Sequence, residues 1–135
     1  MNMEKHRIND DHHGMPAAGK TLTVPLVSPD GQEEFLLDIS RGGISIKKVK
    51  LQNRAREIVV LFRLELNGPP HRNPDDEEVP TPHIHMYREG YGAKYAYTPP
   101  SEYFTNLSDE ATTLREFLVF CKITKPPHID PRLFP

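Results

Sequence analysis

Apolar and polar residues alternate along several stretches of this chain, which is the pattern of β-strands with one buried face. The stretches 22–26 and 35–39 each carry three apolar residues at period two, and residues 28–31 between them read SPDG. This tetrapeptide has the composition of a tight turn. The pattern therefore predicts a β-hairpin.

Four further predicted strands follow the hairpin. Ile44 and Ile46 begin one of them after the Gly42–Gly43 break, and residues 58–67 form the most regular one, with one apolar row and a second row that includes Arg63 and Glu65. Residues 83–89 and 94–98 then form two short strands around a GYG turn. Residues 68–81, rich in proline and charge, predict a long loop.

A single amphipathic helix is predicted after the strands. Ser108 is a suitable N-cap, acidic residues follow it, and apolar residues recur at helical spacing up to Cys121. The predicted fold is an α+β domain over residues 21–135, an antiparallel meander of about five to six strands with one main C-terminal helix on one face. Residues 1–20 predict a disordered polar tail. Ile129, Leu133 and Phe134 in the proline-rich end are expected to pack against the domain or a partner.

Composition narrows the class of protein. The chain has 135 residues and one cysteine, which excludes an internal disulfide and a cysteine-rich zinc site. No apolar run approaches the roughly 18 residues of a membrane span, and no signal peptide is evident, so we expect a cytoplasmic protein without membrane contact. A net charge of −2 lacks the overall basic character of nucleic-acid-binding proteins, although basic residues gather between positions 47 and 63.

The candidate chemistry centres on the segment PHIHMYREGYG, residues 82–92. If the strand 58–67 pairs with it, Arg63 and Glu65 lie on the face that carries His83 and His85. Such a group suits acid/base chemistry, metal binding or phosphate recognition. It also suits a hydrogen-bonded polar face that only stabilises the sheet.

The leading hypothesis from these residues is a metal-independent, ribonuclease-like or RNA-binding protein, in which histidines transfer protons and cations stabilise the phosphorane. It needs no cofactor. The candidate catalytic residues are His83, His85, Arg63, Arg88 and Tyr91. The candidate binding residues are His71, Arg72, Asn73, Lys94 and Tyr97.

Two alternatives remain open. His83-x-His85-x-x-x-Glu89 matches the ligand spacing of the first cupin motif and could hold one divalent ion of zinc, iron or manganese. The cupin pattern expects glycine where Glu77 stands and a fourth histidine, which only His71 or His128 could supply. Tyrosines interleaved with Arg88 could instead form a non-catalytic surface that docks a phage or host protein.

The strings RLELNGPPHRNPD and PHIHMYREGYG resemble a family of uncharacterised bacterial and prophage proteins, and the resemblance extends over roughly residues 33–134. The family is a domain of unknown function. The resemblance implies a mobile-element setting, in which toxins and anti-defence proteins occur. It also implies a shared motif that draws the loop residues into the site: Arg63, Glu65, His71, Asn73, His83, His85, Arg88, Glu89 and Tyr91.

Overall fold

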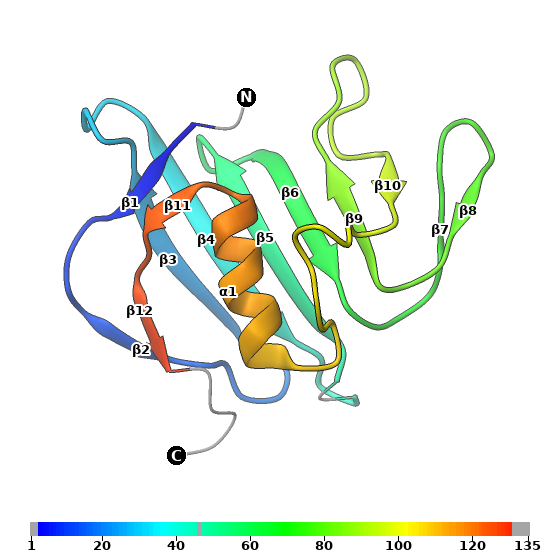
Figure 1. The fold of residues 1–135 in the computed structure, drawn as a ribbon, viewed down its shortest axis with the longest axis horizontal. Coiled ribbons are helices and arrows are strands. Elements are labelled where there is room, and N and C mark those ends of the chain that lie inside the picture. Colours follow the sequence, from blue (N-terminus) through cyan, green and yellow to red (C-terminus); the bar gives the residue numbers. More distant parts are fainter. Residues whose placement is uncertain (1–2, 46, 131–135) are drawn as a thin grey trace.

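An eight-stranded, mostly antiparallel sheet with one helix against it dominates the computed structural model, which describes residues 3–45 and 47–130 (Figure 1). Two small two-stranded sheets flank it. In order across the large sheet the strands are β10 (Ala96–Tyr97), β9 (His83–Met86), β6 (Val59–Glu65), β5 (Val49–Ala55), β4 (Glu34–Arg41), β3 (Thr21–Val27), β1 (Lys5–Arg7) and β11 (Ile123–Lys125). The α+β class is as predicted, whereas the sheet has more strands than expected.

The alternation in the sequence correctly locates the central strands. β3 and β4 form the predicted hairpin, and β5, β6 and β9 continue the meander with antiparallel pairing. β9 is shorter than expected because it ends at Met86, and only an isolated bridge joins Arg88 to Gly92. Gly90 and Gly92 have φ angles of 84° and 60°, so the glycines provide the left-handed conformations that this turn requires.

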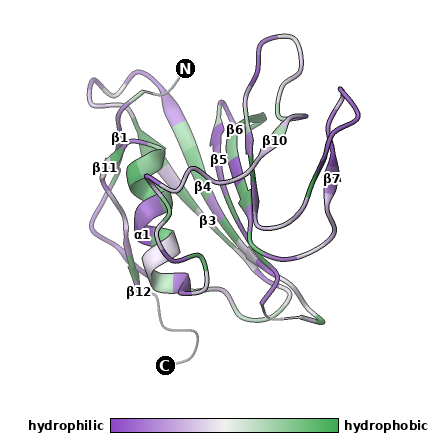
Figure 2. Ribbon diagram, turned by 45° about the vertical axis from the view of Figure 1, so that its right-hand side comes forward, coloured by the Kyte–Doolittle hydropathy of each residue, from purple (hydrophilic) through white to green (hydrophobic). Residues whose placement is uncertain are grey.

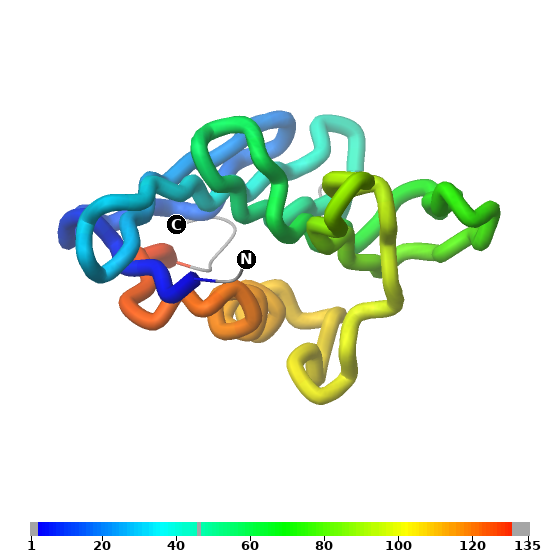
Figure 3. Tube along the Cα trace, turned by 90° about the horizontal axis from the view of Figure 1, so that it is seen from above, coloured from blue at the N-terminus to red at the C-terminus, as the bar shows by residue number. Residues whose placement is uncertain are grey.

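The helix α1 (Glu110–Phe120) packs on one face of the sheet (Figures 2 and 3). Its N-cap is Asp109, whose carboxylate accepts a hydrogen bond from the Thr112 amide, so the helix begins one residue later than predicted. Leu114 and Phe117 are buried against the apolar core of the strands. No helix in the described part of the chain has the length and apolar character needed to cross a membrane.

The expected N-terminal tail instead contains two strands. β1 pairs in parallel with β11 and antiparallel with β3, and β2 (His12–Gly14) pairs in parallel with β12 (His128–Asp130). Lys5 is fully buried, and His12 stacks on His128 at 4.8 Å between ring centroids. The prediction missed these strands because their parallel partners lie more than a hundred positions away and three-residue strands show too little alternation. Ile129 lies in β12; Leu133 and Phe134 lie outside the described residues.

Two other predicted segments differ from the structure. The third strand begins at Val49 rather than Ile44, whose side chain is fully exposed, and Ile46 lies outside the described residues. The predicted irregular loop 68–81 contains a short hairpin, β7 (His71–Arg72) and β8 (Glu78–Val79). Figure 2 shows β7 in the colour of hydrophilic residues, which explains why no hydrophobic alternation revealed it.

Candidate functional site

The pairing of β6 with β9 brings the predicted polar residues together. Arg63 lies opposite His85, and Glu65 lies opposite His83, so the assumed register is confirmed. Directly opposed residues in antiparallel strands share a face of the sheet, and this is the face opposite α1. Ile84, between the two histidines, is fully buried on the apolar face and fixes the orientation of the strand.

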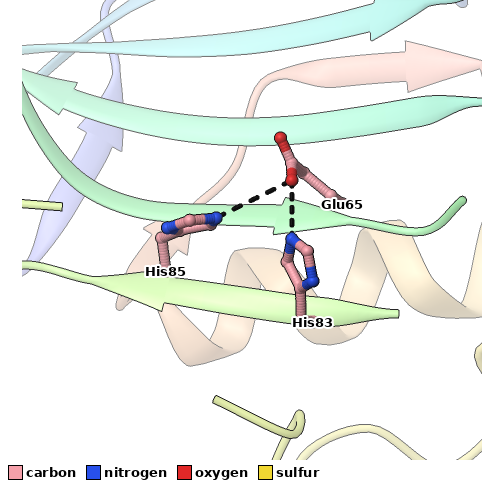
Figure 4. A group of neighbouring side chains, drawn as sticks. All are labelled: Glu65, His83 and His85. Atoms are coloured by element: carbon pink, nitrogen blue, oxygen red, sulfur yellow. Dashed lines mark hydrogen bonds and ion pairs between the residues drawn. The ribbon is translucent and has the colours of Figure 1, made fainter. Parts of the chain in front are cut away.

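Glu65, His83 and His85, which we call the Glu–His cluster, converge through the carboxylate (Figure 4). Glu65 Oε2 lies 2.6 Å from His83 Nε2 and 3.7 Å from His85 Nε2. Both histidines are 1% exposed, whereas the Glu65 side chain is 28% exposed. Glu65 is therefore the member of the cluster that solvent reaches.

Backbone carbonyls orient both imidazole rings. His83 Nδ1 lies 3.2 Å from the Val79 oxygen, and His85 Nδ1 lies 2.8 Å from the Ala93 oxygen. A carbonyl only accepts, so each Nδ1 carries hydrogen and donates it. In a neutral ring this places the lone pair on Nε2, the atom that faces Glu65. Among the described residues, His85 Nε2 is buried and has no hydrogen-bond partner.

The surroundings of Glu65 keep it ionised. The imidazoles of His85 and His83 and the Arg63 guanidinium lower the pKa of the Glu65 carboxyl to about 2, although partial burial opposes this change. Arg63 Nε lies 3.5 Å from Glu65 Oε1. The cluster thus combines a carboxylate with two inward-facing imidazole nitrogens.

The hairpin β7–β8 covers the cluster. The His71 ring lies edge-on to His85, at 4.6 Å between centroids, and its Nε2 donates to the Lys94 oxygen at 2.7 Å. Asn73 fixes the hairpin to β10, since its side chain donates to the Ala96 oxygen and accepts from the Ala96 amide. His71 therefore lies against the Glu–His cluster, whereas Asn73 holds the cover in place.

Other predicted site residues lie apart from the cluster. Glu89 is exposed in the turn after β9 and lies outside the group of ionisable side chains formed by His83, His85 and Glu65. Arg88 lies over the Tyr91 and Tyr95 rings, with its guanidinium carbon 4.2 Å from the Tyr95 centroid. Arg72 pairs with acidic residues of its own hairpin.

Two remaining predicted binding residues have different surroundings. Lys94 touches the site through its backbone oxygen, and its residue is exposed. Tyr97 packs partly buried against the core and stacks with Tyr95. Neither side chain contacts the Glu–His cluster among the described hydrogen bonds and ring contacts.

The sequence analysis did not predict an open hollow of about 540 Å³ that lies beside Glu65. Lys48 and Lys50 line it together with Ser40 and Pro69. Ser40 lies on a strand that the alternation locates, whereas the strand of Lys50 was predicted to begin too early. Both residues join the site through the register, Ser40 opposite Lys50 and Lys50 opposite Glu65. A prediction of the register of all paired strands would have placed both residues in one row with Glu65.

Fold and site together define an α+β protein with a histidine–carboxylate cluster on the polar face of its sheet. Residues 1–123 match the family model of DUF6978, a family of unknown function, and the chain belongs to this family. No curated protein and no solved structure matched the chain.

Proposed function

We propose that this chain is a metal-binding protein that holds one divalent transition-metal ion with Glu65, His83 and His85. The observation that carries the proposal is the direction of the two Nε2 atoms. Carbonyl acceptors occupy both Nδ1 atoms, so two Nε2 lone pairs and an ionised carboxylate face one another. Such a group requires a cation between its members.

The hydrogen bonds behind the cluster match those of metal-binding histidines. A ligating histidine commonly donates its second ring nitrogen to a carbonyl or carboxylate, which fixes the tautomer and the ring orientation. Both rings have such an acceptor, at 3.2 Å for His83 and 2.8 Å for His85. The Arg63 guanidinium, 3.5 Å from Glu65 Oε1, favours the ionised carboxylate, whose Oε2 faces both rings.

A proton is the competing cation. If His83 is doubly protonated, it forms an ion pair with Glu65 across the 2.6 Å contact and needs no metal. That arrangement leaves His85 Nε2 buried without a partner, which costs free energy. A metal ion satisfies all three ligands at once, and this favours the metal.

Two nitrogen ligands and one oxygen ligand suit zinc, and they also suit iron or manganese. Three protein ligands leave a coordination position for water or substrate, as in catalytic rather than structural zinc sites. A metal-bound water would supply a nucleophile at neutral pH. Glu65, the exposed member, marks the side from which a substrate would approach.

The first test is a zinc titration of metal-free protein, followed by elemental analysis after dialysis. We expect one zinc per chain, and we expect His85→Gln to weaken binding by about 100-fold or more, beyond the 10–100-fold that outer partners contribute. His128→Gln is the matched control, because His128 is a partly exposed histidine away from the cluster. Equal zinc affinity in both variants, or no retained zinc in the wild type, overturns the proposal. If His85→Gln does not fold, Glu65→Gln serves the same purpose at a partly exposed position.

A second candidate function, acid/base cleavage of RNA without metal, is favoured by Arg63. Its guanidinium lies beside Glu65 on the face that holds both histidines, where it would stabilise a developing phosphorane. The near-complete burial of both rings makes direct contact with an RNA backbone harder. RNA cleavage that persists in EDTA and disappears in His83→Ala would favour this candidate over the metal. A toxin or anti-defence role in a mobile element remains a prediction.

A further inference from the structure

The hollow beside Glu65, which we call the lysine hollow, is an approach to the Glu–His cluster. Ser40, Lys50 and Glu65 lie side by side on β4, β5 and β6, and His83 follows on β9. This row crosses four paired strands, so each side chain has a fixed neighbour. The row leads from a basic hollow to a buried imidazole.

The two lysines of the hollow form no ion pair with any residue that the structure describes. Among the described residues neither Lys48 nor Lys50 forms an ion pair, although Glu65 is opposite Lys50 across the strand pair. The Lys48 side chain extends toward Gly68, where a Cβ would lie 3.4 Å from Lys48 Cε. Two lysine residues therefore line one concave surface.

Hydroxyl groups add hydrogen-bonding capacity. Ser40 Oγ lies 3.0 Å from Thr21 Oγ1, and when Thr21 donates, the Ser40 hydrogen is free to donate into the hollow. Lysine ammonium groups with a hydroxyl donor are a common means of binding phosphate.

We propose that the lysine hollow binds the phosphate group of a small phosphorylated molecule and directs that molecule toward the Glu–His cluster. The inference rests on the proposed function, because it identifies the substrate class of the same metal site. A volume of about 540 Å³ is within the range of small-ligand sites. A bound metal would offset the repulsion between Glu65 and a phosphate.

The charge around the site disfavours a long polyanion. The β7–β8 hairpin beside the cluster carries the acidic run 75–78, and these four residues are exposed. An RNA backbone lying across this hairpin would meet like charge, whereas a single phosphate on Lys50 would not. A small ligand is therefore the better match.

The experiment is an NMR titration of metal-free protein with inorganic phosphate, monitored at backbone amides. We expect saturable shifts at residues 40, 48 and 50, and about a tenfold or greater loss of affinity in the double variant Lys48→Gln/Lys50→Gln. The control is Lys20→Gln/Lys125→Gln, which removes the same charge from exposed lysines outside the hollow. Its phosphate affinity should remain within about twofold of wild type, because salt screens the long-range effect of removing distant charges.

The outcomes separate this inference from the metal proposal. If the protein binds phosphate through Lys48 and Lys50 but binds no metal, the phosphate site in the lysine hollow is supported and only the metal proposal is contradicted. If the protein binds zinc but phosphate shifts no amide signals, or if both double variants lose phosphate affinity equally, only the phosphate site in the lysine hollow is overturned. A single-stranded uridine oligonucleotide that binds more tightly than phosphate, and depends on the same lysines, overturns the assignment to a small molecule.

Discussion

The two faces of the central sheet come from the same strands but have opposite character. One row across β3 to β10 reads Leu22, Ile39, Leu51, Leu64, Ile84 and Tyr97. The row displaced by one residue in β3 to β9 reads Thr21, Ser40, Lys50, Glu65 and His83. The first row packs under α1, and the second carries the candidate chemistry.

This difference separates stability from chemistry. Four members of the apolar row are at most 2% exposed, so their burial contributes strongly to folding. The polar row includes exposed Lys50, partly exposed Glu65 and buried His83, a gradient from solvent to core along one line. Substitutions on the apolar face should therefore unfold the protein, and those on the polar face should change binding first.

The largest effect is expected at Leu64, which is fully buried on β6 directly beside Glu65 in sequence. Leu64→Ala should lower the free energy of unfolding by about 2–5 kcal/mol, because it leaves a cavity beneath α1. Urea denaturation measures this loss. Val119→Ala, at a position 68% exposed, should change it by less than about 0.5 kcal/mol. Similar losses in both variants would contradict the separation of the two faces.

Asp38 is a residue of the polar face whose substitution should lower the free energy of unfolding. Its carboxylate accepts from Thr23, Gln52 and Arg54, with Arg54 Nε at 2.6 Å. Asp38→Asn should cost about 1–3 kcal/mol because an amide cannot accept from all these donors. Arg54, 25% exposed, retains some solvation, which keeps the loss below that at Leu64.

The pH dependence of unfolding tests the role of Asp38. Burial alone would raise the pKa of this carboxyl, but hydrogen bonds from Arg54, Thr23 and Gln52 lower it below 3.8. A lowered folded-state pKa gives stability that is present above pH 3.8 and lost as the pH falls further. The wild type should therefore lose more stability than Asp38→Asn on acidification. Parallel curves would show that the carboxylate is not the group that titrates.

The sequence could predict the central sheet because alternation is a local signal. It could place Arg63 and Glu65 opposite His83 and His85 because β6 and β9 both show that signal. It could not choose between Glu65 and Glu89 as the carboxylate beside the two histidines, since that depends on where β9 ends. Met86 is its last residue, and the following turn leaves Glu89 exposed.

The hidden parts of the fold depend on distant pairings. Parallel contacts of β1 with β11 and of β2 with β12 join the two ends of the described chain, and no short-range pattern indicates them. Lys5 illustrates the problem, because a lysine in a polar segment gives no sequence signal of complete burial. The lysine hollow was equally hidden, because it requires the register of three strands together.

Substitution of Asn73 tests how the β7–β8 hairpin is held over the Glu–His cluster, and its expected effect is smaller. Its side chain makes two hydrogen bonds with the Ala96 backbone, at 2.9 and 2.8 Å, and is buried. Asn73→Ala should cost about 1–2 kcal/mol and speed hydrogen exchange at the Ala96 amide. Arg72→Ala, on the same hairpin with exposed acidic partners, should cost less than about 0.5 kcal/mol. Unchanged exchange at Ala96 in Asn73→Ala would mean that other contacts hold the hairpin.

The last expected effect is a change in how the free energy of unfolding depends on pH, and it comes from Lys5, which is buried on β1. Lys5 Nζ donates to the Cys121 and Met3 oxygens, and burial lowers its pKa to about 8 from an ordinary 10.5. Between these values the unfolded chain binds more protons than the folded one, so the free energy of unfolding should rise with pH. Burial raises the pKa of the Cys121 thiol in the folded protein, so deprotonation of this thiol in the unfolded chain opposes the contribution of Lys5 in the same pH range.

Comparison with Lys5→Met isolates this contribution, because the other groups that titrate in the same range remain in both proteins. Urea denaturation at pH 7.5, 9 and 10, values chosen around the window from about 8 to 10.5, should show the wild type gaining stability relative to Lys5→Met. Lys125→Met, at an exposed position of β11, should follow the wild type. If Lys5→Met also follows the wild type, the ammonium of Lys5 stays charged in the folded protein, and the carbonyl oxygens around it offset its burial.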